Sequence, residues 1–209
     1  MNVDFKKNLG ITGVVLAGGR GTRLGRQKAL ERIVGEKSLI ENTVETITPF
    51  CQEIIVVTSK EQFGCISSIK LKAKIVVDIF PGKAALGGLY TGLVNSSALC
   101  ALTVACDMPF LNQSLLRYMI ELAHGFDAVV PNIGGKIELL HAIYSTNCLE
   151  PIKRLLDSNV LQVLKLLDLV KTRYVTQVEV DRYDPKHLSF FNINTANDLV
   201  IAKNLLANN

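Results

Sequence analysis

Residues 11 to 28 read Ile11-Thr-Gly-Val-Val-Leu-Ala-Gly-Gly-Arg-Gly-Thr-Arg-Leu-Gly-Arg-Gln-Lys28. The short apolar run at residues 14–17 is typical of a buried parallel strand. Four glycines follow it, interleaved with three arginines and a lysine. Glycines let the backbone approach a ligand closely and present amide N–H groups, and the basic side chains can neutralise phosphate oxygens. The stretch therefore predicts a strand that runs into a polyphosphate-binding loop.

This loop differs from the two best-known phosphate-binding motifs. A P-loop ends in Gly-Lys-Ser/Thr, whereas here Lys28 follows Gln27 and precedes Ala29. A dinucleotide-binding loop has the spacing G-x-G-x-x-G, and residues 19–25 are one residue too long for it. The competing interpretation is a solvated loop with incidental charge.

Apolar runs alternate with helical segments along the first two thirds of the chain. We expect helices near residues 39–48, 61–69, 87–97 and 113–123, and strands at residues 14–17, 53–58, 74–78, 99–105 and 126–131. Such alternation predicts an α/β fold with a mostly parallel sheet, whose ligands bind beyond the carboxyl ends of the strands. In the remainder we expect strands at 136–144 and 173–180, two helices within 148–170, and a last helix to residue 206.

The composition bounds the class of protein. A chain of 209 residues with 48% hydrophobic and 20% charged residues is typical of one globular domain. No apolar run is long enough for a membrane span, and the first residues lack the apolar core of a secretory signal. A net charge of +4 without an aromatic–basic platform does not favour nucleic acid as a partner. Five cysteines without C-x-x-C spacing indicate reduced thiols in a cytoplasmic protein.

Two aspartates follow predicted strands, Asp78 and Asp107. A carboxylate at the end of an apolar strand is unfavourable without a partner, and a hard cation such as Mg²⁺ provides one. We therefore expect Asp107 to bind a metal, with helix capping as the alternative. Asp78 precedes a Pro81-Gly82 turn, where an aspartate is a typical turn residue.

Four segments carry a resemblance to a known family. They are Leu16-Ala-Gly-Gly-x-x-x-Arg-Leu-Gly-x-x-Lys28, Asp78-Ile-Phe-Pro-Gly-x-x-x-Leu-Gly-Gly-Leu89, Ala105-Cys-Asp-Met-Pro-Phe-Leu111 and Phe191-Asn-Ile-Asn-Thr-x-x-Asp-Leu199. In order and type they resemble the motifs of the sugar-nucleotide-type nucleotidyltransferases. Within that group the chain is most similar to the molybdenum cofactor guanylyltransferases.

The resemblance implies a three-layer α/β/α Rossmann-like nucleotidyltransferase fold with a mostly parallel sheet, as a single domain over residues 1–209. Residues from about 10 to 131 would bind the nucleotide, and those from about 132 to 209 the acceptor. The implied reaction is Mg²⁺-dependent transfer of GMP from GTP to the phosphate of molybdenum-bound molybdopterin, with release of pyrophosphate. No general base is required, because a phosphate monoester is already anionic at neutral pH.

The matched motifs also imply the site residues. The catalytic residues are Arg23, Lys28 and Asp107, and the metal ligands are Asp107 and Asn194, with Asn192 as the alternative to Asn194. Either asparagine can instead be a turn residue before the last helix. The nucleotide-binding residues are Leu16, Ala17, Gly18, Gly19, Lys28, Ser59, Asp78 and Asp107.

Several positions depart from the family pattern. Gln27 replaces an aspartate, Ser59 an asparagine near the base and Leu139 a proline. These changes leave three alternatives: CTP in place of GTP, another phosphorylated acceptor, or a non-enzymatic nucleotide-binding domain. The Ala17-Gly-Gly19 form favours guanine, because related cytidylyltransferases often carry Leu-Ala-Ala-Gly there. The presence of Lys28, Asp78 and Asp107 together favours an enzyme.

Overall fold

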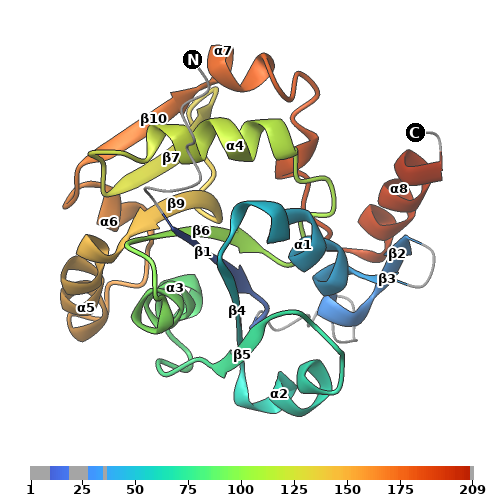
Figure 1. Ribbon diagram of the computed structural model, residues 1–209, viewed down its shortest axis with the longest axis horizontal. Coiled ribbons are helices and arrows are strands. Elements are labelled where there is room, and N and C mark those ends of the chain that lie inside the picture. The colour runs from blue at the N-terminus through green and yellow to red at the C-terminus, as the bar shows by residue number, and fades with distance from the viewer. Residues whose placement is uncertain (1–9, 19–27, 35–36, 208–209) are drawn as a thin grey trace.

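The computed structural model describes residues 10–18, 28–34 and 37–207. In these residues the centre is an eight-stranded sheet in the order β10-β7-β9-β6-β1-β4-β5, with β8 paired to β7 (Figure 1). A short hairpin lies outside this sheet. The strands of the sheet are β1 (Ile11–Leu16), β4 (Glu53–Thr58), β5 (Lys74–Val77), β6 (Cys100–Ala105), β7 (Ala128–Ile133), β8 (Lys136–Ile137), β9 (His141–Ser145) and β10 (Thr172–Thr176), and those of the hairpin are β2 (Arg32–Val34) and β3 (Lys37–Ser38).

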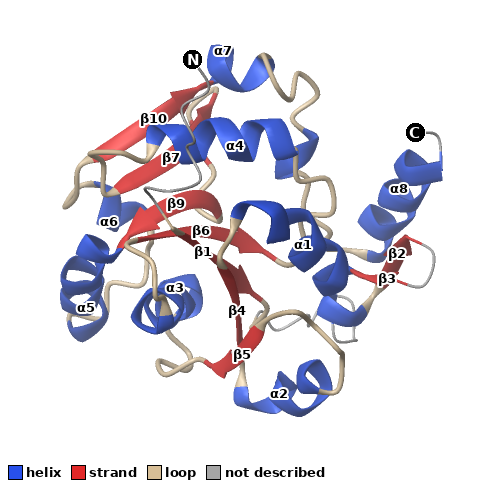
Figure 2. Ribbon diagram, in the orientation of Figure 1, coloured by secondary structure: helices blue, strands red, loops and turns tan. Residues whose placement is uncertain are grey.

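Helices cover both faces of the sheet (Figure 2). The helices are α1 (Leu39–Ile47), α2 (Lys60–Ser67), α3 (Ala84–Asn95), α4 (Gln113–Leu122), α5 (Leu149–Asp157), α6 (Leu164–Leu167), α7 (Gln177–Asp181) and α8 (Ala196–Ala207). Val15 and Leu102 face a core shared with α1 and α4, whereas Val14 and Ala101 face α3 and α5. Burial on both faces explains why the strands are continuous apolar runs. The predicted three-layer α/β/α fold is confirmed.

The strand directions place four carboxyl ends at one edge of the sheet. β1 pairs in parallel with β4 and with β6, and β4 pairs in parallel with β5. β10 is likewise parallel to β7, but β9 lies between β6 and β7 and is antiparallel to both. The sheet is thus mostly parallel, as expected, and the loops after β5, β4, β1 and β6 emerge side by side.

Two helix starts that the sequence predicts are present with their capping hydrogen bonds. The Ser38 hydroxyl accepts from the Glu41 N–H while the Glu41 carboxylate accepts from the Ser38 N–H, which is the reciprocal capping box that opens α1. Asn112 caps α4 by accepting from the Leu115 N–H at 3.0 Å. Within the described residues, none of these helices combines the length and the apolar character of a membrane-crossing segment.

Two expected strands are wrong in extent. The strand expected over 136–144 is two strands, β8 and β9, separated by a turn. The strand expected over 173–180 ends at Thr176, and the chain continues as α7. The reason is a second capping box, in which Thr176 and Glu179 exchange hydrogen bonds. Burial raises the pKa of Glu179, but hydrogen bonds from Tyr118, Thr176 and Arg173 outweigh it and lower the pKa to about 2.

Helix α3 packs very closely on the sheet through Gly92. A Cβ at this glycine would lie 2.4 Å from the Val14 Cγ1, a contact that only movement of the helix or the strand could relieve. We expect Gly92→Ala to lower the free energy of unfolding by about 1–3 kcal/mol, as other overpacked cores do.

The matched control is Gly64→Ala in helix α2, where a Cβ would meet nothing within 4 Å. This change should raise the free energy of unfolding by about 0.5–1 kcal/mol, because alanine is the better helix former. Urea unfolding of both variants measures the difference. A Gly92→Ala protein as stable as the wild type would contradict the close approach.

Candidate active site

A cleft of about 1080 Å³ lies at the carboxyl ends of β5, β4, β1 and β6. The cleft is where ligands bind in open parallel α/β sheets. Its lining includes predicted site residues from six separate parts of the chain, namely Leu16, Ala17, Gly18, Lys28, Ser59, Asp78, Asp107 and Asn194.

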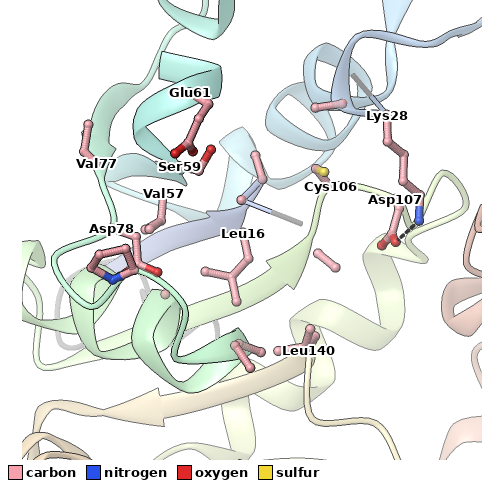
Figure 3. Close-up of a pocket in the computed structure, with 18 of the residues that line it drawn as sticks. Leu16, Lys28, Val57, Ser59, Glu61, Val77, Asp78, Cys106, Asp107 and Leu140 are labelled. Carbon is pink, nitrogen blue, oxygen red and sulfur yellow. Dashed lines mark hydrogen bonds and ion pairs between the residues drawn. The ribbon is translucent and has the colours of Figure 1, made fainter. Parts of the chain in front are cut away.

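One side of the cleft carries a compact polar cluster. The Lys28 Nζ lies 2.5 Å from the Asp107 Oδ2 (Figure 3). It also donates a hydrogen bond to the Asn194 Oδ1 at 3.0 Å. The Lys28 and Asp107 side chains are only 15% and 18% exposed, so solvent screens their attraction less than it would at the surface. Three residues far apart in the sequence thus meet around one ammonium group.

The chain before α8 is fixed against the end of β6, which explains the position of Asn194. The Ile193 N–H donates to the Asp107 carbonyl oxygen at 3.0 Å. The N–H groups of Asn194 and Thr195 donate to the Asp198 carboxylate at 2.9 and 2.8 Å, and these bonds lower the pKa of Asp198. Asn192 instead donates from its side chain to the Phe190 carbonyl oxygen. Of the two asparagines, Asn194 is therefore the one whose side-chain oxygen lies beside Asp107.

The oxygens of this cluster suit a hard divalent cation. Among the described residues, nothing donates a hydrogen bond to the Asp107 Oδ1, although this atom is buried. A buried carboxylate oxygen without a partner is unfavourable, and a cation would satisfy it. The described part of the chain holds no group of three or more His, Cys, Asp or Glu that could cage a metal. One carboxylate and one amide oxygen instead match the way Mg²⁺ binds together with substrate phosphates.

The opposite side of the cleft carries Ser59, Glu61 and Asp78 (Figure 3). The Asp78 Oδ1 accepts from the Phe80 N–H and from the Thr91 hydroxyl, both at 2.9 Å. Asp78 is therefore a turn residue through one oxygen while it also lines the cleft, so the two interpretations of the sequence are compatible. Ser59 is the N-cap of α2 in backbone conformation, but its side chain makes no capping hydrogen bond.

A model of the MobA-like NTP transferase domain matches residues 13–172. The chain belongs to this family. It is a nucleotidyltransferase, as the motifs predict.

Individual relatives agree with this assignment. The chain is 34% identical over 197 residues to a probable molybdenum cofactor guanylyltransferase of Pelotomaculum thermopropionicum, with 94% of each chain covered. Its fold is similar to that of the molybdopterin-guanine dinucleotide biosynthesis protein A of Archaeoglobus fulgidus, with a TM-score of 0.82 at 26% identity over 95% of this chain and 100% of that one. A 4-diphosphocytidyl-2C-methyl-D-erythritol synthase of Anaerococcus prevotii, 16% identical over 95% and 96%, shares the fold with a TM-score of 0.72.

The structure of this nucleotidyltransferase describes only some of the predicted site residues of the first loop. The Ala17 N–H donates to the Val57 carbonyl oxygen at 2.8 Å, which holds the end of β1 beside β4. A Cβ at Gly18 would lie 3.5 Å from the Ser59 backbone nitrogen, an ordinary contact. Gly18 is therefore placed close to the start of α2 without needing special backbone geometry. Gly19 and Arg23, both predicted site residues, lie outside the described residues.

Several cleft residues were not predicted. Lys60 and Glu61 line the cleft from the first turn of α2, and Leu140 lines it from the turn before β9. Glu61 could have been found from its place after a predicted strand that ends at the binding edge. Leu140 could not, because its place depends on the antiparallel insertion of β9. Ala84, also in the lining, has a positive φ of 51°.

The cleft contains no histidine among its described lining residues. His141 is fully buried behind it, and burial lowers its pKa to about 4. Its ring packs edge-on against Phe190. The imidazole is therefore neutral at physiological pH.

Proposed function

We propose that the protein transfers GMP from Mg²⁺-bound GTP to the terminal phosphate of molybdenum-bound molybdopterin and releases pyrophosphate. The observation that supports this most strongly is the cluster of Lys28, Asp107 and Asn194 across the cleft from Ser59 and Asp78. The cluster gives the cleft one cationic side that suits phosphates and a metal ion. The opposite side is separate and can accept a nucleoside. The activity for which the relative from Pelotomaculum thermopropionicum is named favours the same reaction.

In this reaction an oxygen of the acceptor phosphate attacks the α-phosphorus of GTP, and the bond from the α-phosphorus to the bridging oxygen breaks. The electron pair leaves with pyrophosphate. Asp107 and Asn194 would hold the divalent cation, which would neutralise charge on the phosphates. Lys28 binds the same phosphates as a point charge, and the cleft orients the two reactants.

The order of the strand ends suggests how the nucleotide lies. With phosphates at Asp107 after β6, the ribose and base extend past β1 toward Ser59 after β4 and Asp78 after β5. Asp78 then lies within reach of the ribose. The acceptor binds from the side of the cleft that residues after 131 form, which include Leu140 and Asn194.

Glu61 supports guanine as the base. Figure 3 shows its side chain beside Ser59, away from the Lys28–Asp107 pair. An ionised carboxylate only accepts hydrogen bonds, and guanine offers two adjacent donors, its ring N1–H and its 2-amino group. Cytosine offers one donor, its 4-amino group, next to an acceptor nitrogen that a carboxylate repels. A carboxylate on the base side therefore fits GTP better than CTP.

We predict that Glu61→Ala weakens the preference for GTP over inosine triphosphate, which lacks the 2-amino group. Hydrogen bonds to charged groups contribute about 1.5–3 kcal/mol, so the preference should fall by about ten-fold or more. Calorimetry with both nucleotides measures it, and Glu121→Ala in α4, an exposed glutamate outside the cleft, is the control. An unchanged ratio in the Glu61 variant would assign base recognition to other residues.

The proposed reaction is tested by incubating the protein with the molybdopterin acceptor, Mg²⁺ and each of GTP, CTP, ATP and UTP in turn. Pyrophosphate release should be fastest with GTP and should require the acceptor. Equal or faster release with CTP would replace the guanylyl assignment by a cytidylyl one. Release with none of the four nucleotides would refute the proposal.

We also propose that the protein is located in the cytoplasm and that the chain forms a single domain. The cysteines form no disulfide within the described residues, and burial raises the pKa of Cys51 and Cys106 to about 12. Thiols that stay protonated and outside disulfides are typical of a reducing compartment. Strands from both the nucleotide and the acceptor parts belong to one sheet.

A further inference from the structure

The Lys28 ammonium lies where a cation would be expected to bind. It contacts the Asp107 Oδ2 at 2.5 Å and the Asn194 Oδ1 at 3.0 Å. These are side-chain oxygens of the two residues that would hold the divalent ion in the proposed reaction. An ammonium group has three donors and one positive charge. In this cluster it therefore provides the positive charge and the contacts to oxygen that a bound metal ion would otherwise provide.

A divalent ion held by the Asp107 carboxylate and the Asn194 Oδ1 would lie close to the Lys28 ammonium, which contacts both side chains. Two cations a few ångströms apart repel one another, and the Lys28–Asp107 pair is mostly enclosed, which strengthens the repulsion. Rearrangement of the side chain is nevertheless feasible, because lysine carries its charge on a flexible four-carbon stem. Lys28 opens a short 3-10 turn whose next residue, Ala29, is buried. The backbone is thus anchored while the ammonium can move.

We propose that the Lys28 ammonium competes with the divalent cation for Asp107 and Asn194, and that the nucleotide phosphates relieve this competition. A triphosphate carries several anionic oxygens, so it attracts Lys28 away from Asp107 and brings further ligands for the metal. The cation then binds tightly only together with nucleotide. This inference rests on the proposed function, since it assumes that phosphates and metal meet at this cluster.

The competition has a direct consequence for metal affinity. If the paired conformation accounts for nine tenths of the molecules or more, the affinity of the free protein for the cation is lowered about ten-fold or more. Removal of the ammonium should restore that affinity without any nucleotide. The same substitution removes a phosphate contact, so it should tighten metal binding while it weakens nucleotide binding.

The test is a titration of the full chain with Mn²⁺ alone, followed by electron paramagnetic resonance of the free ion. We expect Lys28→Ala to bind Mn²⁺ about ten-fold more tightly than the wild type or better. Lys28→Arg, which keeps the charge, should bind it as weakly as the wild type. Lys60→Ala is the matched control, because Lys60 also lines the cleft and its loss changes the net charge equally.

Three outcomes decide the matter, once thermal melts have established that each variant is folded. Tighter Mn²⁺ binding by Lys28→Ala alone supports the competition. Equal tightening by Lys60→Ala would mean that the general charge of the cleft sets the Mn²⁺ affinity, and this result would overturn the proposed competition. Unchanged binding by Lys28→Ala overturns it as well. None of these readouts uses catalysis, so failure of the proposed reaction shows separately, as absence of pyrophosphate release with saturating metal.

Discussion

Asp107→Asn is expected to slow nucleotidyl transfer by about two to three orders of magnitude, because one such electrostatic contact commonly lowers the barrier by about 3–4 kcal/mol. The substitution keeps the shape of the side chain and removes the charge that would hold the metal. The buried Oδ1 of Asp107, which has no hydrogen-bond donor among the described residues, is the atom on which this expectation depends. Steady-state transfer across a Mg²⁺ titration measures the loss.

Stability provides the control for this substitution. The Asp107 carboxylate pairs with Lys28 in the structure, so it is not an uncompensated charge at the end of β6. Both side chains border the cleft, and we expect the free energy of unfolding to change by no more than about 1 kcal/mol, as for a partly screened ion pair. A variant that keeps near-normal turnover and Mg²⁺ dependence would place the metal elsewhere.

Lys28→Ala should reduce kcat/KM by a comparable two to three orders of magnitude, because the departing pyrophosphate loses the positive charge that stabilises its growing negative charge. Part of the loss should appear as weaker GTP binding, since Lys28 contacts the phosphates before and during the reaction. Transfer kinetics with GTP as the varied substrate separate the two contributions.

The comparison with Asp107→Asn makes this prediction specific. Lys28→Ala should lower turnover without raising the Mg²⁺ concentration that half-maximal rate requires, whereas Asp107→Asn should raise that concentration. Because Lys28 and Asp107 are in direct contact, the double variant should lose less than the sum of the two single effects. A Lys28 variant that melts early but turns over normally would show that the residue is structural.

Local sequence patterns predicted much of the fold. Ser38 and Glu41 have the spacing of a capping box, and α1 begins there because both hydrogen bonds form. The same spacing occurs at Thr176 and Glu179, where the capping box opens α7 and so ends β10 earlier than the strand expected over 173–180. The antiparallel placement of β9 between β6 and β7 had no local signal, since a strand buried on both faces has the same apolar residues in either direction.

The candidate site could be predicted in its residues but not in its contacts. Motif matches selected Lys28, Asp107 and Asn194, yet their mutual distances depend on how β1, β6 and the segment before α8 are packed. Asn192 and Asn194 are equivalent in the sequence. They differ in the structure because the Ile193 N–H bonds to the Asp107 carbonyl oxygen and brings the next side chain over the cleft.

The proposed reaction transfers the α-phosphorus of GTP to the acceptor phosphate. It is tested most directly by single turnover with GTP labelled at either the α- or the γ-phosphorus, in the presence of Mg²⁺ and molybdenum-bound molybdopterin. We expect the α-label in the acceptor and the γ-label in pyrophosphate. Recovery of the α-label as free GMP, or of the γ-label on the acceptor, would contradict it.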